Sequence, residues 1–181
     1  MSSRRSKARS TGRSKRLAVA GRATELLVEL RSSVRRDVPA AVRVARWARA
    51  AAGARGKGAE IAVRVVGSAE GRRLNLLWRG RDYPTNVLSF PAPSRTRGGL
   101  AARTLGDIVI CAPVVAREAR EQGKSIDHHW AHLVVHGVLH LLGHDHERDR
   151  DAERMERRER VILSRLRIAD PYRISSSVSE H

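Results

Sequence analysis

The sequence contains little that would cross-link it or anchor it in a membrane. Its single cysteine, Cys111, excludes an internal disulfide, and we interpret it as a small apolar residue in a reducing compartment. No apolar run approaches the ~18 residues that a membrane span needs. The short apolar stretch at residues 17–20 does not suffice for a signal peptide. We therefore expect a cytoplasmic protein with no membrane partner.

Aromatic residues are also scarce, at 3% of the chain, although 41% of its residues are hydrophobic. Leucine, valine, isoleucine and alanine must therefore build most of the core. A length of 181 residues suits one domain with a substantial core and is short for two.

Acidic residues are outnumbered, which gives a net charge of +17. Residues 1–22 carry eight Lys or Arg and no acid, and residues 23–102 carry fifteen basic and six acidic residues. Residues 103–181 carry thirteen of each. This asymmetry favours a polyanionic partner such as nucleic acid, because binding to phosphates releases condensed counterions. The alternative is an ordinary solvated surface of a basic protein.

The composition suggests three segments. Residues 1–22 have few apolar side chains to bury and are expected to form a disordered basic tail. Residues 23–174 are expected to form the folded domain, and residues 175–181 a flexible C-terminal tail.

Hydrophobic patterning predicts interleaved strands and helices. Asp37 is the expected N-cap of the first helix, with Pro39 in its first turn, and Gly80 is expected to end the second. Only some intervals are long enough for parallel crossovers, so we predict an α+β domain with a mixed, roughly four-stranded sheet. The expected strands are 24–30, 60–66, 85–90 and 105–111, and the expected helices are 37–52, 68–79, 113–122, one from about 127, and 148–167.

Seven of the eight histidines lie between His128 and His146. Of these, His136 and His140 are four residues apart and share one face of a helix. Gly143 can end that helix in the left-handed conformation, so that the chain turns back and brings His146 to the same point. Three neutral nitrogen ligands suit one zinc ion and leave its fourth position open, as in catalytic zinc sites. We therefore predict a metal site on a central helix and the turn after it.

Two alternatives to a catalytic metal site remain open. A structural zinc site would need a fourth protein ligand, which His132 or His144 would have to supply. We assign His132 to packing or to a hydrogen bond behind the ligands. A histidine-rich surface helix without metal is the other alternative, and the many apolar residues at 133–142 argue against it.

The ligand spacing is that of one zinc protease class, H-E-x-x-H-x-x-G-x-x-H. Gly137, however, stands where those enzymes have their glutamate general base. The pattern therefore supports the metal site and argues against peptide hydrolysis.

At these residues the sequence resembles the YbeY family of bacterial rRNA maturation factors, which are metal-dependent endoribonucleases. The resemblance spans about 150 residues in family order. Besides H-G-V-L-H-L-L-G-H-D-H, the similar segments are L-N-L-L-W-R-G, T-N-V-L-S-F-P, L-G-D-I-V-I-C, M-E-R-R-E and D-P-Y. His144 departs from the pattern, since many members have tyrosine there, and the tail of residues 1–22 is not part of it.

The resemblance implies a zincin-like α+β fold and a single zinc ion held by His136, His140 and His146. It also implies cleavage of single-stranded RNA, maturation of ribosomal RNA including the 16S rRNA 3′ end, ribosome quality control, and the small ribosomal subunit as partner. Carried over by position, Arg79 is the family's arginine near the cleft.

We assign the chemistry to His136 with its metal and to Arg79, whose planar guanidinium suits a phosphate. The candidates for supporting the ligands are His132, Asp145 and Asp107. The general base, the attacking group (water or the RNA 2′-hydroxyl), the RNA sequence cleaved and the oligomeric state stay open. The competing functions are a non-catalytic, zinc-stabilised ribosome assembly factor and a zinc peptidase or amidase.

Overall fold

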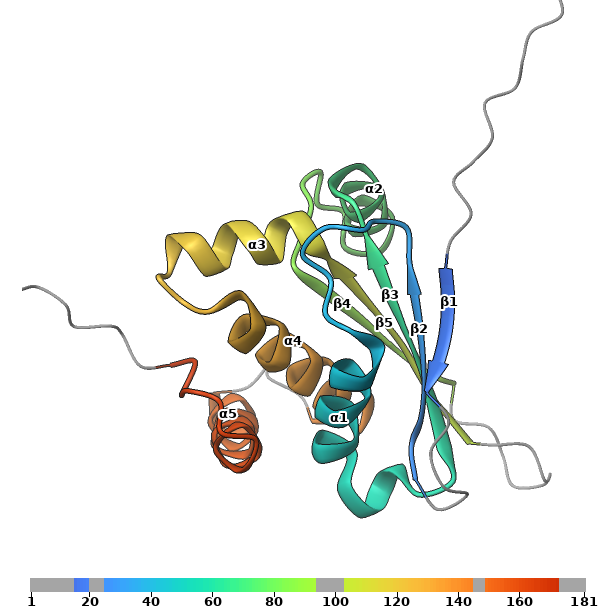
Figure 1. Ribbon diagram of the computed structural model, residues 1–181, viewed down its shortest axis with the longest axis vertical. Coiled ribbons are helices and arrows are strands. Elements are labelled where there is room, and N and C mark those ends of the chain that lie inside the picture. Colours follow the sequence, from blue (N-terminus) through green and yellow to red (C-terminus); the bar gives the residue numbers. More distant parts are fainter. Residues whose placement is uncertain (1–14, 20–24, 94–102, 145–148, 173–181) are drawn as a thin grey trace, which may run out of the picture.

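The computed structural model describes residues 15–19, 25–93, 103–144 and 149–172, which form a five-stranded sheet and its covering helices (Figure 1). The strands are β1 (Lys15–Val19), β2 (Leu27–Ser32), β3 (Ala59–Val66), β4 (Val87–Pro91) and β5 (Arg103–Cys111). The helices are α1 (Ala41–Ala52), the 3-10 turn η1 (Gly53–Gly56), α2 (Ser68–Arg79), α3 (Ala112–Glu121), α4 (Ile126–Leu141) and α5 (Asp149–Arg165).

The strand order is β1-β2-β3-β5-β4. The inner strands β2, β3 and β5 pair in parallel, while β1 and β4 pair antiparallel to their neighbours at the two edges. A helix crosses over between β2 and β3, as parallel pairing requires. The predicted α+β class and mixed sheet are confirmed, and β4 is an edge strand of the sheet.

The fifth strand, β1, lies within residues 1–22, which we expected to be a tail. Its residues 15–19 pair with β2 from Lys15 opposite Ser32 to Val19 opposite Val28. Basic composition does not exclude this pairing, because a strand is held by backbone hydrogen bonds. The expectation of a tail is therefore wrong for residues 15–19, and the rest of it lies outside the described residues, as do residues 173–181.

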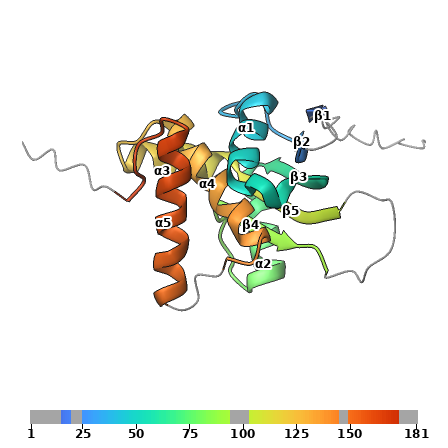
Figure 2. The ribbon, with the colours of Figure 1, turned by 90° about the horizontal axis from the view of Figure 1, so that it is seen from below.

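Most of the core lies between one face of the sheet and the helices α1 and α4, with α5 packed outside α4 (Figure 2). Val28, Val63 and Ile108 from three neighbouring strands are fully buried there. A smaller cluster, which includes Leu74 of α2 and Leu88 of β4, lies on the opposite face. No helix among the described residues is long and apolar enough to cross a membrane.

The helix ends follow the sequence only in part. Helix α1 begins at Ala41 and not at Asp37, which has φ 58° in the preceding loop. The reason is Pro39, which disfavours a helical conformation at the residue before it. The predicted ends of α2 at Gly80 and of α4 before Gly143 are confirmed, with φ 67° and 81°.

A buried polar contact joins α3, α4 and the start of β4. The Glu118 carboxylate accepts hydrogen bonds from His129 Nε2 at 2.8 Å and from Asn86 Nδ2 at 3.0 Å. Burial alone would raise the pKa of Glu118, but these hydrogen bonds and the nearby positive charges outweigh it and hold the pKa below its usual value.

We expect Glu118→Ala to lower the free energy of unfolding at neutral pH by about 1–3 kcal/mol, because it leaves the buried His129 without this partner. Since folding lowers the pKa of Glu118, its contribution is present above the unfolded pKa of 4.5 and is lost as pH falls through the lower folded value. Urea unfolding measured from pH 7 to pH 3 should show that the free energies of unfolding of Glu118→Ala and wild type converge below pH 4.5. Glu121→Ala, at an exposed carboxylate of the same helix, is the control.

Candidate metal site

Helix α4 is the element that positions the histidines. Most of its residues are buried, which fixes the orientation of the few polar side chains that it carries. His132, His136 and His140 recur every four residues, so they lie along one stripe of the helix and are each only partly exposed. The chain then leaves the helix through a left-handed turn at Gly143, with His144 N bonded to Leu139 O.

A fully buried carboxylate, Glu159 of α5, lies behind this stripe. Its Oε1 accepts a hydrogen bond from His136 Nδ1 at 2.8 Å, and its Oε2 accepts one from His132 Nε2 at 3.2 Å. The Tyr172 hydroxyl donates a further hydrogen bond to Oε2. A charged group is buried at such a position only when it is paired and hydrogen-bonded, and Glu159 meets that condition with three donors.

These donors keep the carboxylate ionised. Burial acts to raise the pKa of Glu159, but the hydrogen bonds from His132, His136 and Tyr172 outweigh it and lower the pKa to about 2. Burial and the same carboxylate raise the pKa of Tyr172, so its hydroxyl keeps its proton and stays a donor. At neutral pH the site therefore contains one fixed negative charge behind the two imidazoles.

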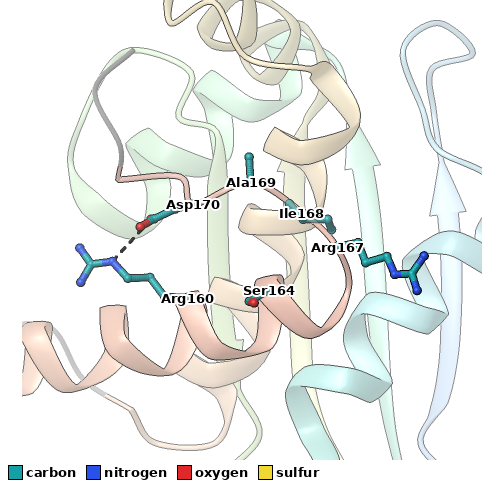
Figure 3. A pocket seen from close by; sticks show the side chains of 6 residues that line it. All are labelled: Arg160, Ser164, Arg167, Ile168, Ala169 and Asp170. Atoms are coloured by element: carbon teal, nitrogen blue, oxygen red, sulfur yellow. Dashed lines mark ion pairs between the residues drawn. The ribbon is translucent and has the colours of Figure 1, made fainter. Parts of the chain in front are cut away.

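The segment after α5 brings Tyr172 to this carboxylate. Arg160 of α5 contacts the Asp170 carboxylate at 3.5 Å, and its guanidinium lies over the Tyr172 ring, 4.8 Å from the ring centre. Lys124 Nζ donates to Pro171 O at 2.6 Å. Arg160, Asp170 and Arg167 are among the residues that line a pocket of about 540 Å³. Figure 3 shows the Arg160 side chain directed at the Asp170 carboxylate, while Arg167 points away from both.

Two arrangements of a metal ion are compatible with these side chains. In the first, His132, His136 and Glu159 hold the ion directly, since their ligand atoms lie within 4.8 Å of one another. In the second, Glu159 orients His136 through Nδ1, and the opposite ring nitrogen, Nε2, faces the ion. The second arrangement is the usual one, because a histidine ligand almost always donates its other N–H to a carboxylate, carbonyl or water.

The residues predicted from the sequence divide into three groups. His136 and His140 lie one turn apart on α4, and His132 contacts Glu159. His146 and Asp145 lie outside the described residues, so the three-histidine ligand set stays a prediction. The remaining two are exposed: Arg79 ends α2, and Asp107 lies on β5 opposite Phe90 of β4.

Glycine at position 137 is explained by close packing of α4 on the sheet. A Cβ atom there would lie 3.0 Å from Ile108 Cδ1 and 3.3 Å from Ser89 Oγ. Both distances are shorter than ordinary van der Waals contacts, so a side chain at this position requires its neighbours to shift by a few tenths of an ångström. The glutamate of the zinc proteases is therefore absent from the sequence, and at this position it would also crowd the Ile108 and Ser89 side chains.

Sequence reasoning missed Glu159 and Tyr172. The many acidic and basic residues of the last helix are typical of a solvated face, but the Glu159 side chain is fully buried. The signal was present in the segments M-E-R-R-E and D-P-Y, because Glu159 shares a helix face with the buried Met155, four residues earlier, and Ile162, three residues later.

We expect Glu159→Gln to weaken zinc binding about 10–100-fold, because it removes the negative charge that supports His136. Competition with a chromophoric chelator measures the affinity, and circular dichroism checks the fold. Glu156→Gln, on the same helix and partly exposed, should bind zinc as the wild type does. Equal affinities in both variants would contradict the role given to Glu159.

We expect Gly137→Glu, which restores the protease pattern, to lower the free energy of unfolding by at least about 1–3 kcal/mol through overpacking against Ile108. It should give no peptide cleavage. Thermal unfolding and a fluorogenic peptide assay measure the two effects, with His128→Glu at the start of α4 as the control. A stable variant that cleaves peptides would refute both expectations.

The sequence is similar to known proteins over most of its length. The family model described as "Endoribonuclease YbeY" matches residues 32–167. The chain is 58% identical over 140 residues to Endoribonuclease YbeY of Stenotrophomonas maltophilia strain R551-3, covering 76% of this chain and 87% of the relative. It is 57% identical over 154 residues to Endoribonuclease YbeY of Alkalilimnicola ehrlichii, covering 84% of this chain and 93% of the relative.

The solution structure of TM1509 from Thermotoga maritima matches with a TM-score of 0.43 and 25% identity, over 73% of this chain and 87% of that one. The chain belongs to the YbeY endoribonuclease family.

Proposed function

We propose that this protein is a zinc-dependent endoribonuclease that cleaves single-stranded RNA, with one ion held by His136, His140 and His146. The observation that carries the proposal is the hydrogen bond from His136 Nδ1 to the buried Glu159 carboxylate. It fixes the ring so that Nε2 can face an ion on the side away from α5. His140, one helical turn further on, belongs to the same stripe of α4.

The donor set suits zinc, which is commonly bound by imidazole nitrogens. When bound, such an ion supplies Lewis-acid polarisation of a phosphoryl oxygen and activation of water. The residues of this chain then have separate tasks: Glu159 holds His136 in one tautomer, and Arg79 binds a phosphate oxygen with its planar guanidinium. Asp145 and Asp107 stay candidates for supporting roles, and no general base is assigned.

RNA is the substrate that family membership supports, and ribosomal RNA of the small subunit, with its 16S 3′ end, is the proposed target. The relatives that match most of this chain are named as endoribonucleases. The net charge of +17 agrees with a polyanionic partner. The rival peptidase function is disfavoured because Gly137 stands where the zinc proteases have their glutamate base. A zinc-stabilised assembly factor without activity is the remaining rival, and only a cleavage assay separates it from the nuclease.

We expect His140→Ala to lose bound zinc and to lower the rate of RNA cleavage at least about 100-fold, since a metal contributes several kcal/mol to such a reaction. Elemental analysis measures the zinc, and gels of labelled single-stranded and duplex RNA measure cleavage. His128→Ala, in the first turn of the same helix and two turns before His136, should retain both. Cleavage that persists in His140→Ala without metal would contradict the proposal, and a zinc-loaded wild type without cleavage would favour the assembly factor.

The same assay on His132→Ala distinguishes the two arrangements of the ion. If His132, Glu159 and His136 hold the metal directly, His132→Ala loses it while His140→Ala retains it. If Glu159 only orients the ligands, as we propose, His140→Ala loses the zinc while His132→Ala retains it. The zinc affinity of His132→Ala then falls by no more than about 10–100-fold.

A further inference from the structure

The end of α2 exposes an unusual group of apolar side chains that the metal site does not use. Trp78 is 62% exposed and Leu77 66%, and Tyr83 in the loop after the helix is half-exposed. The other two tryptophans of the chain, Trp47 and Trp130, are buried. A large aromatic ring left in solvent on an otherwise well-packed domain points to a binding role.

This aromatic surface is held in a fixed position. The Trp78 ring meets Phe90 of β4 edge-on, with ring centres 5.3 Å apart. The buried Asn75 donates through Nδ2 to Tyr83 O at 2.6 Å, which fixes the loop beyond the left-handed turn at Gly80. Binding to a surface that is already ordered costs less conformational entropy.

Positive charge surrounds these rings. In the described part of the chain, no ion pair engages Arg73, Arg79 or Arg81, and Arg81 Nη1 contacts the Tyr83 hydroxyl at 3.2 Å. The two nearby acids are already paired, Asp82 with Arg72 and Glu70 with Arg64. Aromatic rings interleaved with free arginines form the combination that binds single-stranded nucleic acid, since bases stack on the rings and phosphates meet the guanidinium groups.

The edge strand β4 connects this surface to the metal site. Alternate residues of a strand point to opposite faces. Ser89 faces α4 beside Gly137, the residue after His136, while Phe90 points to the other face and meets Trp78. Figure 2 shows β4 between α4 and α2. An RNA strand that passes over the edge of β4 therefore reaches both the aromatic surface and the metal site.

We infer that Trp78, supported by Phe90, is a stacking platform for a base of the single-stranded RNA substrate, and that the backbone of this RNA crosses the edge of β4. This inference rests on the proposed function, because it states where the same substrate is held. It assigns Trp78 a positioning role and gives a physical reason for a preference for single strands: a paired and stacked base has no free face to offer the ring.

The test uses intrinsic fluorescence, because Trp78 is the exposed tryptophan and the other two are buried. A ten-nucleotide oligoadenylate is titrated into the full-length, zinc-loaded protein, and an abasic strand of equal length serves as the control with the same phosphates. Stacking predicts quenching by the oligoadenylate that saturates with binding and only weak quenching by the abasic strand. Equal quenching by both strands would overturn the inference.

Variants test the same contact by fluorescence anisotropy with labelled oligoadenylate. We expect Trp78→Ala to weaken binding about tenfold and Trp78→Phe to stay within about threefold of wild type, because phenylalanine keeps a stacking face. Leu77→Ala, at an equally exposed neighbour, should bind RNA as the wild type does. Thermal unfolding checks that each variant folds.

The outcomes separate this inference from the proposed function. Unchanged RNA binding in Trp78→Ala would overturn the inference while cleavage and zinc dependence stand. Equal losses of RNA affinity in Leu77→Ala and Trp78→Ala would also overturn it, in favour of a general apolar docking surface for a protein. The protein could also show quenching by oligoadenylate and weaker RNA binding in Trp78→Ala but no RNA cleavage. That result would contradict the proposed nuclease function and still support the RNA-binding surface.

Discussion

The site depends on one buried charge. Glu159 has no exposed surface, yet its carboxylate stays ionised because His132, His136 and Tyr172 donate to it. Removing one partner of such a buried group costs about 3–5 kcal/mol, whereas each surface ion pair of α5 contributes about 0–1 kcal/mol. Among the many charges of this helix, Glu159 is therefore the one that fixes how α5 lies against α4.

The same carboxylate links three separate parts of the chain. The histidines come from α4, the carboxylate from α5, and the tyrosine from the segment after α5, which Arg160 and Lys124 hold in place. A shift of that segment would withdraw the tyrosine hydroxyl and alter the electrostatics behind His136. The orientation of the imidazole is thus set by tertiary packing and not by the helix alone.

The histidine spacing made the first half of the site predictable. Residues four apart on a helix must share a face, and glycine after a helix commonly ends it, so His136, His140 and the turn at Gly143 followed from local rules. Glu159 lies 23 residues after His136 on a helix dense in charges, where local rules describe a solvated surface. Its partners are long-range contacts, which the sequence of one segment does not specify.

The fold shows the same division between local and long-range information. Strands and helices with clear periodicity were predicted close to their observed bounds. Strand β1 was not predicted, because it is held to β2 by backbone hydrogen bonds, which do not depend on the side chains. The start of α1 was misplaced because Asp37 is a good cap in isolation, while Pro39 two residues later restricts the chain before it.

The closeness of α4 to the sheet has consequences on both sides of β4. Without a side chain at position 137, the helix approaches Ile108 of β5 and Ser89 of β4 closely. A glutamate in the protease position would press on these two side chains. Glycine at this position therefore suits the close approach of α4 to Ser89, and the next residue of β4, Phe90, meets the ring of Trp78 on the other face. On the proposed function, a nucleic acid strand, which needs a phosphate site and a surface for its bases, would use both faces of that edge.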